Sequence, residues 1–64
     1  MIAIGARVRI RTDRLYLVEA NTVLTGVVTD RHVPHSDDMP MLRILRDGQR
    51  LSEEWSENFW ELET

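Results

Sequence analysis

Aliphatic residues recur with a period of two over ten residues, at positions 2–11 of the chain. The aliphatic positions are Ile2, Ile4, Ala6, Val8 and Ile10. Because strand residues two apart share a face, this pattern predicts a strand whose aliphatic face turns inward. The opposite face then presents a row of basic side chains about 7 Å apart, namely Arg7, Arg9 and Arg11.

The alternation stops at Thr12, and a long excursion without regular patterning follows. We expect Leu15 and Leu17 to lie beneath this excursion. Residues 22–33 are rich in β-branched side chains, which favours a second strand. Within it, Gly26 indicates a bend or a close approach of another backbone.

Two prolines and two acidic residues fall within residues 32–40 and predict a loop. Residues 41–46 then predict a third strand. The dipeptide Asp47-Gly48 is a two-residue hairpin signal, because both residue types tolerate the positive φ angles of a type I′ turn. Residues 49–52 would form the returning strand.

The C-terminal segment fits two interpretations. One is a helix, since four apolar residues follow a helical spacing, namely Leu51, Trp55, Phe59 and Leu62. The other is a turn at Ser56-Glu57-Asn58 followed by an alternating strand. We favour a short 3₁₀ or α turn near residues 53–58 and then a brief final strand.

These elements together predict an all-β fold, a small and partly open barrel of five antiparallel strands with a short helical turn near the C-terminus. The alternative is an α+β fold in which the C-terminal segment is one helix. The expected core includes Ile4, Val8, Ile10, Val28, Leu51 and Leu62.

Composition limits the chain to one small domain over residues 1–64. Of these residues 42% are hydrophobic and 30% are charged, and a chain of this size buries only about 60% of its surface on folding. There is no cysteine to supply a disulfide. The start of the chain lacks the features of a signal peptide and no stretch is long enough to insert into a membrane, so we expect a cytoplasmic protein.

Charge is divided unevenly along the chain. Residues 1–31 hold five arginines and three acidic residues, whereas residues 32–64 hold three arginines and eight acidic residues. The total of −3 and the acidic C-terminal end oppose binding to the phosphate backbone, so we expect no direct binding to duplex DNA.

The chain resembles the SH3-like barrels, and among them the small reaction-centre subunit IV of photosystem I and related accessory subunits of photosynthetic complexes. The matching residues are Gly5, Arg7-Val8-Arg9-Ile10, Tyr16, Gly26, Val28, Pro40, Asn58-Phe59 and Glu61-Leu62. The chain departs from that pattern around Tyr16, where Thr12, Leu15 and Leu17 replace a proline and an aromatic pair. The resemblance implies a docking module that serves a larger assembly.

Two groups of residues are candidates for binding a partner. The arginine row, with Tyr16 nearby to stack a base, is suited to phosphate; alternatively, Arg7, Arg9 and Arg11 pair with Glu61 and Glu63 across neighbouring strands. The second group is aromatic and acidic. We expect one member of the Trp55 and Trp60 pair to lie in the core and the other outside as a binding anchor, with acidic residues around it, namely Glu53, Glu54 and Glu57.

The sequence offers few candidate residues for metal binding or catalysis. Imidazole and carboxylate suit a divalent metal, but a group of His32, His35, Asp37 and Asp38 in a polar loop is more typical of solvated side chains, and we expect no metal or other cofactor. No serine has the context of a nucleophile and the three glycines are isolated, so we expect no enzyme activity.

Three functions remain open. The first is a small non-enzymatic module that binds one protein partner as an accessory or regulatory subunit. The second is a phage inhibitor of the anti-CRISPR kind, whose acidic surface imitates nucleic-acid phosphates. The third is an enzyme assembled by oligomerisation, because SH3-like barrels of plasmid-borne dihydrofolate reductases form an active site in this way.

Overall fold

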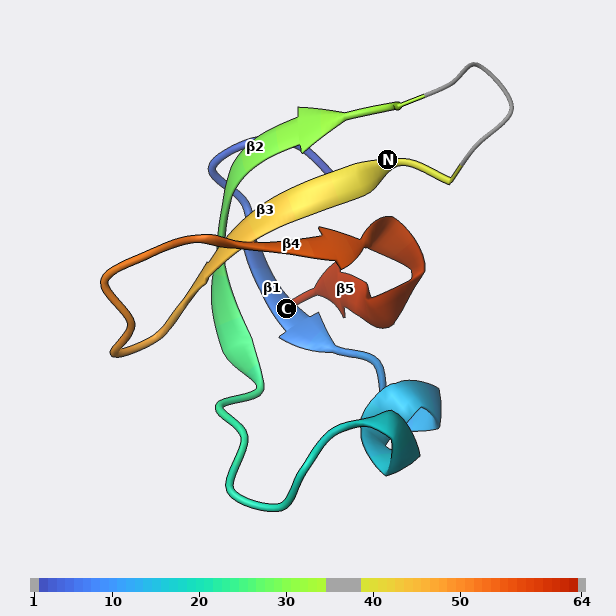
Figure 1. Ribbon diagram of the computed structural model, residues 1–64, viewed down its shortest axis with the longest axis vertical. Helices are drawn as coiled ribbons and strands as arrows, with labels where there is room; N and C mark the ends of the chain where they lie inside the picture. The colour runs from blue at the N-terminus through green and yellow to red at the C-terminus, as the bar shows by residue number, and fades with distance from the viewer. Residues whose placement is uncertain (1, 35–38, 64) are drawn as a thin grey trace.

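A computed structural model of the protein describes residues 2–34 and 39–63. They form one antiparallel sheet of five strands in the order β4-β3-β2-β1-β5 (Figure 1). The elements are β1 (Arg7–Ile10), the 3₁₀ helix η1 (Thr12–Leu17), β2 (Thr25–His32), β3 (Met41–Arg46), β4 (Glu53–Ser56), the 3₁₀ helix η2 (Glu57–Phe59) and β5 (Trp60–Leu62). The prediction of an all-β fold with five antiparallel strands is confirmed.

Strand β1 is shorter than the alternation predicts. A turn precedes it, in which Gly5 has a φ of 91° and the Ala6 amide donates to the carbonyl oxygen of Ala3. This turn carries Ile4 to the surface, where 60% of the residue is exposed, so its expected place in the core is wrong. Ile2, on the other side of the turn, is buried.

Strand β2 bends where the glycine predicts a close approach, and that prediction is confirmed. A Cβ atom at Gly26 would lie 2.6 Å from the carbonyl oxygen of Leu45 and 2.9 Å from the Cα atom of Arg46. Further along, the register with β3 shifts between Val28 and Asp30. The curvature lets β2 pair with β1 through its first half and with β3 along most of its length (Figure 1).

Strand β3 occupies the predicted residues, but the hairpin after it differs from the prediction. The amide of Gln49 donates to the carbonyl oxygen of Arg46, and of the two turn residues only Gly48 has a positive φ. That is the pattern of a type II turn, whose twist does not match that of a tight hairpin. The chain therefore crosses a longer loop, and the expected returning strand over residues 49–52 is wrong because β4 begins at Glu53.

The C-terminal segment is a strand, a short turn and a strand, so the alternative of one helix is wrong. The turn expected near residues 53–58 comes at residues 57–59 instead, because residues 53–56 form strand β4. Strand β5 then pairs with β1, opposing Trp60 to Ile10 and Leu62 to Val8. The first and last strands of the chain are thus neighbours.

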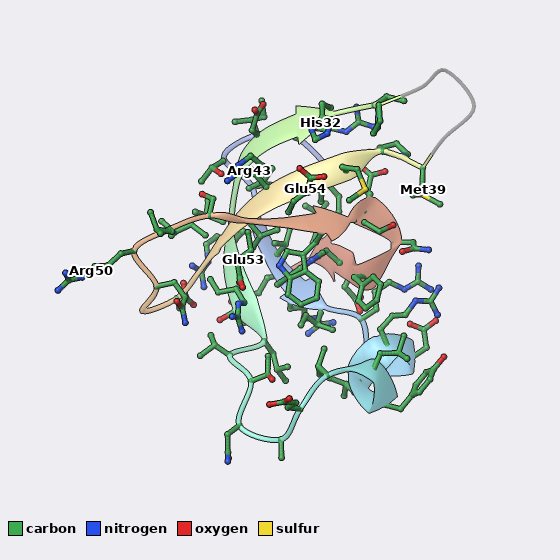
Figure 2. All side chains as sticks on the ribbon, viewed as in Figure 1. His32, Met39, Arg43, Arg50, Glu53 and Glu54 are labelled. Atoms are coloured by element: carbon green, nitrogen blue, oxygen red, sulfur yellow. The ribbon has the colours of Figure 1, made fainter. Side chains whose placement is uncertain are left out.

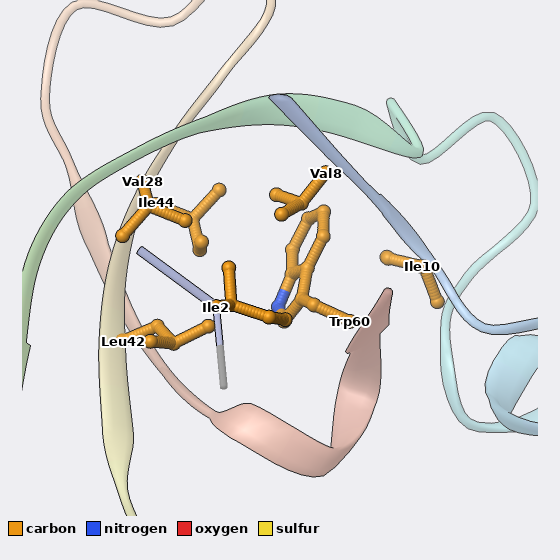
Figure 3. Close-up of a cluster of buried hydrophobic side chains, with 7 residues drawn as sticks. All are labelled: Ile2, Val8, Ile10, Val28, Leu42, Ile44 and Trp60. Atoms are coloured by element: carbon orange, nitrogen blue, oxygen red, sulfur yellow. The ribbon is translucent and has the colours of Figure 1, made fainter. Parts of the chain in front are cut away.

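The core fills the concave side of the curved sheet (Figure 3) and consists of Ile2, Val8, Ile10, Val28, Leu42, Ile44 and Trp60. Three of the expected core residues are among them. The prediction of Leu51 as a core residue is wrong, because Leu51 lies in the β3–β4 loop and is 80% exposed. Leu62 is wrong because β5 is a terminal strand of a sheet that does not close, which leaves this residue 49% exposed. No helix in the described part of the chain could cross a membrane.

Candidate binding surface

The excursion between β1 and β2 covers residues 11–24 and begins with η1. Hydrogen bonds at its two ends fix it to the sheet. The amide of Arg11 donates to the carbonyl oxygen of Phe59, and the amide of Ile10 donates to that of Leu24, both at 2.8 Å. In a 3₁₀ helix, consecutive side chains point about 120° apart. Leu15, Tyr16 and Leu17 therefore cannot all face the core.

Tyr16 is the most exposed of these three residues, at 78%, and Leu15 and Leu17 are 38% and 52% exposed. The expectation that Leu15 and Leu17 lie beneath the excursion is wrong, because a single six-residue 3₁₀ segment has only one side toward the sheet and buries none of its residues. Tyr16, a predicted binding residue, is open to a partner.

The second part of the excursion, residues 18–24, contributes two further exposed apolar residues. It turns at Asn21, whose φ of 72° is in the left-handed region that asparagine tolerates. Val23 and Leu24 follow and are each 38% exposed. The whole excursion forms one end of the long axis of the molecule (Figure 1). We call this set of residues the apolar end: Leu15, Tyr16, Leu17, Val23 and Leu24.

The arginine row faces carboxylates from other elements. Arg7 donates to Asp47 at 2.7 and 2.9 Å and lies 3.4 Å from Glu63, and Arg9 lies 3.6 Å from Glu61. The expected cross-strand pairing of Arg7 and Arg9 with the two glutamates is confirmed. The hydrogen bonds from Arg7 and from the Thr25 hydroxyl hold the pKa of Asp47 well below its usual range.

Arg11 does not continue this cross-strand pattern. It stands immediately before η1 and donates to Asp13 within the same segment, at 3.1 and 2.9 Å. Arg14 lies 3.8 Å from the same carboxylate. The hydrogen bonds from Arg11 lower the pKa of Asp13 and raise the pKa of Arg11 itself. Each member of the arginine row therefore has an acidic neighbour.

The two tryptophans pack against each other, which corrects the expectation that one lies inside and the other outside. Trp60 is 2% exposed and Trp55 is half-buried, with their rings 5.4 Å apart in an edge-to-face arrangement. Trp55 also contacts Phe59, at 5.6 Å between ring centroids. Both side chains point to the inner side of the sheet, since Trp55 is opposite Leu42 in the register with β3. Their Nε1 atoms are buried without a hydrogen-bond partner among the described residues.

The three acidic residues expected around the tryptophans lie beside basic side chains. Glu53 accepts from Arg46, whose guanidinium carbon lies 6.0 Å from the centre of the Trp55 ring. Glu57 accepts from Arg31 at 3.0 Å in a half-buried pair.

Glu54 is on the outer face, opposite Arg43 in the register and 3.9 Å from the imidazole of His32 (Figure 2). The structure thus places the three glutamates on different sides of β4 and η2 rather than in one acidic surface.

Metal ligation and pocket binding find no support in residues 2–34 and 39–63. These residues contain no group of three potential metal ligands and enclose no pocket. Of the loop residues considered as ligands, His32 lies at the end of β2 beside Glu54, whereas His35, Asp37 and Asp38 fall outside the described residues.

Sequence analysis identified Tyr16 but missed the four aliphatic members of the apolar end. The available signal was a run of apolar residues inside a segment with neither helical nor strand periodicity, which leaves such a run without a partner face to cover it. It also missed Asp47 as the partner of Arg7, since the turn propensity of Asp47 accounted for its presence. Comparison of the chain with protein-family models, with curated proteins and with solved structures finds no match.

Proposed function

We propose that this protein is a small protein-binding module, an accessory or regulatory subunit that docks one protein partner through the apolar end. The observation that supports this proposal is the exposure of Leu15, Tyr16 and Leu17 on the same short 3₁₀ helix. Scattered apolar residues are common on protein surfaces, but Tyr16 is 78% exposed on an anchored turn, and tyrosine is enriched among the residues that dominate binding energy.

The proposed SH3-like architecture is supported by the order of the elements. The first strand lies between the second and the last, the longest described connection follows β1, and a single 3₁₀ turn separates β4 from β5. In this architecture the long connection after the first strand projects from the barrel as an anchored loop. The apolar end is that projecting connection.

Charge on the described surface favours an apolar contact over imitation of nucleic-acid phosphates. An acidic mimic needs carboxylates that are open to a basic groove. Four glutamates of the C-terminal half instead lie within 4.0 Å of arginine side chains, namely Glu53, Glu57, Glu61 and Glu63. The acidic-mimic alternative would have to break these pairs first.

The test begins with capture of the partner from the source cell and continues with purified components. Tyr16→Ser and Leu17→Ser remove the exposed apolar surface, and Leu51→Ser is the matched control because Leu51 is equally exposed but lies in another loop. We expect each apolar-end variant to weaken the purified complex by at least about 30-fold, as for a binding hot spot. The control should bind like the wild type.

A triple variant, Glu53→Gln with Glu54→Gln and Glu57→Gln, separates the two binding modes. If the triple variant loses the partner while Tyr16→Ser keeps it, the acidic mimic replaces the proposed function. The salt dependence of the wild-type affinity gives a second criterion, because a complex held by many charge pairs weakens steeply as salt rises.

A further inference from the structure

The second half of β2, residues 29–32, is an open strand edge. On one side these residues pair with β3 (Figure 1). On the other side the pairing of β2 with β1 ends at Val27. The last backbone bonds on that side join Val28 to Gly5 and Ala6, and no backbone group among the described residues bonds to residues 29–32 there. An open edge of this kind is able to pair with a strand of another chain.

The backbone amide of Arg31 points to this open side. In a strand of L-amino acids, the face that a side chain takes also fixes the side to which the amide of that residue points. Val28 and Arg31 share the inner face of β2. Their partners in the register with β3 are the buried Ile44 and Leu42. The amide of Val28 donates to the carbonyl oxygen of Ala6, on the β1 side. The amide of Arg31 therefore points to the same side, past the point where the pairing with β1 ends.

The carboxylate of Asp30 occupies this amide. It accepts a hydrogen bond from the Arg31 amide at 2.8 Å. Asp30 is opposite Arg43 in the register, but the Arg43 guanidinium donates to the carbonyl oxygen of Ser52 at 3.2 Å. The side chain of Arg31 turns inward and donates to Glu57. Natural sheets keep their edges from pairing by such means, with charged side chains on the edge, charged side chains directed inward and bulges.

We propose that Asp30 keeps the open edge of β2 from pairing with the same edge of a second copy of the chain. Two such edges would pair antiparallel around Arg31, and each Arg31 amide would then exchange the Asp30 carboxylate for a carbonyl oxygen of the other copy. Loss of a hydrogen bond to a charged group weakens an equilibrium at least about 10-fold, and a symmetric pair loses two of them. Residues 29–32 do not belong to the apolar end, so this edge is separate from the surface of the proposed function.

The test is sedimentation equilibrium on the purified full chain, from micromolar to millimolar concentration. Asp30→Ala removes the acceptor, whereas Asp30→Asn removes the same charge but keeps an oxygen acceptor. Glu54→Ala is the matched control, because Glu54 is an acid on the outer face whose carboxylate lies 3.9 Å from the imidazole of His32. We expect the wild type, Asp30→Asn and Glu54→Ala to stay monomeric. Asp30→Ala should form a dimer, with an association constant at least about 100-fold above the limit set by the wild type.

Hydrogen exchange of backbone amides identifies the surface that this dimer uses. In the Asp30→Ala dimer the Arg31 amide donates to the other copy, so its exchange should be at least about 10-fold slower than in the same variant diluted to monomer. The fluorescence of Trp55 and Trp60 verifies that each variant is folded, since both lie in or against the core.

Four results would overturn the proposal. The first is a folded Asp30→Ala that stays monomeric at every concentration, and the second is a wild-type dimer in which the Arg31 amide is protected. The third is an Asp30→Ala dimer whose Arg31 amide exchanges freely, because that dimer uses another surface. The fourth is equal association of Asp30→Ala with Asp30→Asn or Glu54→Ala, which assigns the effect to net charge instead of the hydrogen bond.

Discussion

The guanidinium of Arg7 donates two hydrogen bonds to the carboxylate of Asp47, which is 40 residues further along the chain. The same carboxylate accepts from the hydroxyl of Thr25, and the same guanidinium reaches Glu63. One pair of side chains thus connects the first strand, the second strand, the β3–β4 loop and the C-terminal end. This connection replaces the tight hairpin that the dipeptide Asp47-Gly48 predicts.

We expect acidic pH to remove the contribution of the Arg7–Asp47 pair to the stability of the fold. The folded pKa of Asp47 lies below the ordinary value of 3.8 that applies when the chain is unfolded. A lowered folded pKa means that the stabilisation is present above the unfolded pKa and is lost as the pH falls toward the folded one. We expect Asp47→Asn to lower the urea midpoint at pH 7, with a difference from the wild type that shrinks below about pH 4.

Urea titrations of both proteins from neutral to acidic pH measure this difference. Asp30→Asn is a control, since the one hydrogen bond that Asp30 accepts among the described residues comes from the neighbouring Arg31 amide. A difference between the wild type and Asp47→Asn that stays constant down to pH 2 would contradict the prediction.

Gly26→Ala should destabilise the fold by about 1–3 kcal/mol. The added Cβ would lie 2.6 Å from the carbonyl oxygen of Leu45, and that backbone atom cannot move without disturbing the pairing of β2 with β3. Gly48→Ala is the comparison, because it meets nothing within 4 Å and costs only the strain of its φ of 86°, about 1 kcal/mol. Thermal or urea unfolding measures the loss of stability in each variant. An equal loss in the two variants would show that steric overlap is not the cause of the destabilisation by Gly26→Ala.

Trp60→Ala should leave the chain unfolded. Truncating a buried aromatic residue costs about 3–5 kcal/mol, which equals the whole stability of a domain of this size. Trp60→Phe should fold, because it keeps a ring against Trp55 and removes an indole N–H that has no acceptor among the described residues. Circular dichroism and amide NMR spectra measure folding, and a well-folded Trp60→Ala would contradict the place of this residue in the core.

The isolated protein should not bind random duplex DNA at physiological salt. Arg7, Arg9 and Arg11 each neighbour a carboxylate, so contact with phosphate would require breaking an existing pair, against a total charge of −3. Glu61→Gln with Glu63→Gln removes the carboxylate beside Arg9 and one of the two beside Arg7, and this variant is expected to gain weak, salt-sensitive affinity in fluorescence anisotropy. Tight binding by the wild type would contradict the prediction.

Local patterns predicted those parts of the fold where one strong preference decides the structure. The apolar alternation placed Val8 and Ile10 in the core, and the glycine in the second strand marked a real close approach. The predictions fail where contacts between residues distant in the sequence determine the structure. Ile4 belongs to the same alternation but a turn with a left-handed glycine removes it, and Leu51 has suitable chemistry but no neighbour to cover it.

The candidate site was predictable only in part, for the same reason. Tyr16 could be singled out as an aromatic residue in a loop. The exposure of Leu15 and Leu17 depends on the geometry of a 3₁₀ helix, which no periodic pattern of apolar residues in the sequence predicts. The contact between Trp55 and Trp60 depends on η2 bringing the ends of β4 and β5 together on one side of the sheet, which residue spacing along the chain does not encode.

The register shift in β2 decides which residues in the second half of the strand face the core. Up to Val28 the strand turns its even-numbered residues inward; after the shift, Arg31 pairs with the buried Leu42 and turns inward toward Glu57, while Asp30 and His32 face outward. Without the shift, simple alternation from Val28 would turn Asp30 and His32 toward the core, whereas deleting Thr29 would leave the orientations as they are. Lineages of this protein that lack position 29 should therefore keep the same inward and outward residues along β2.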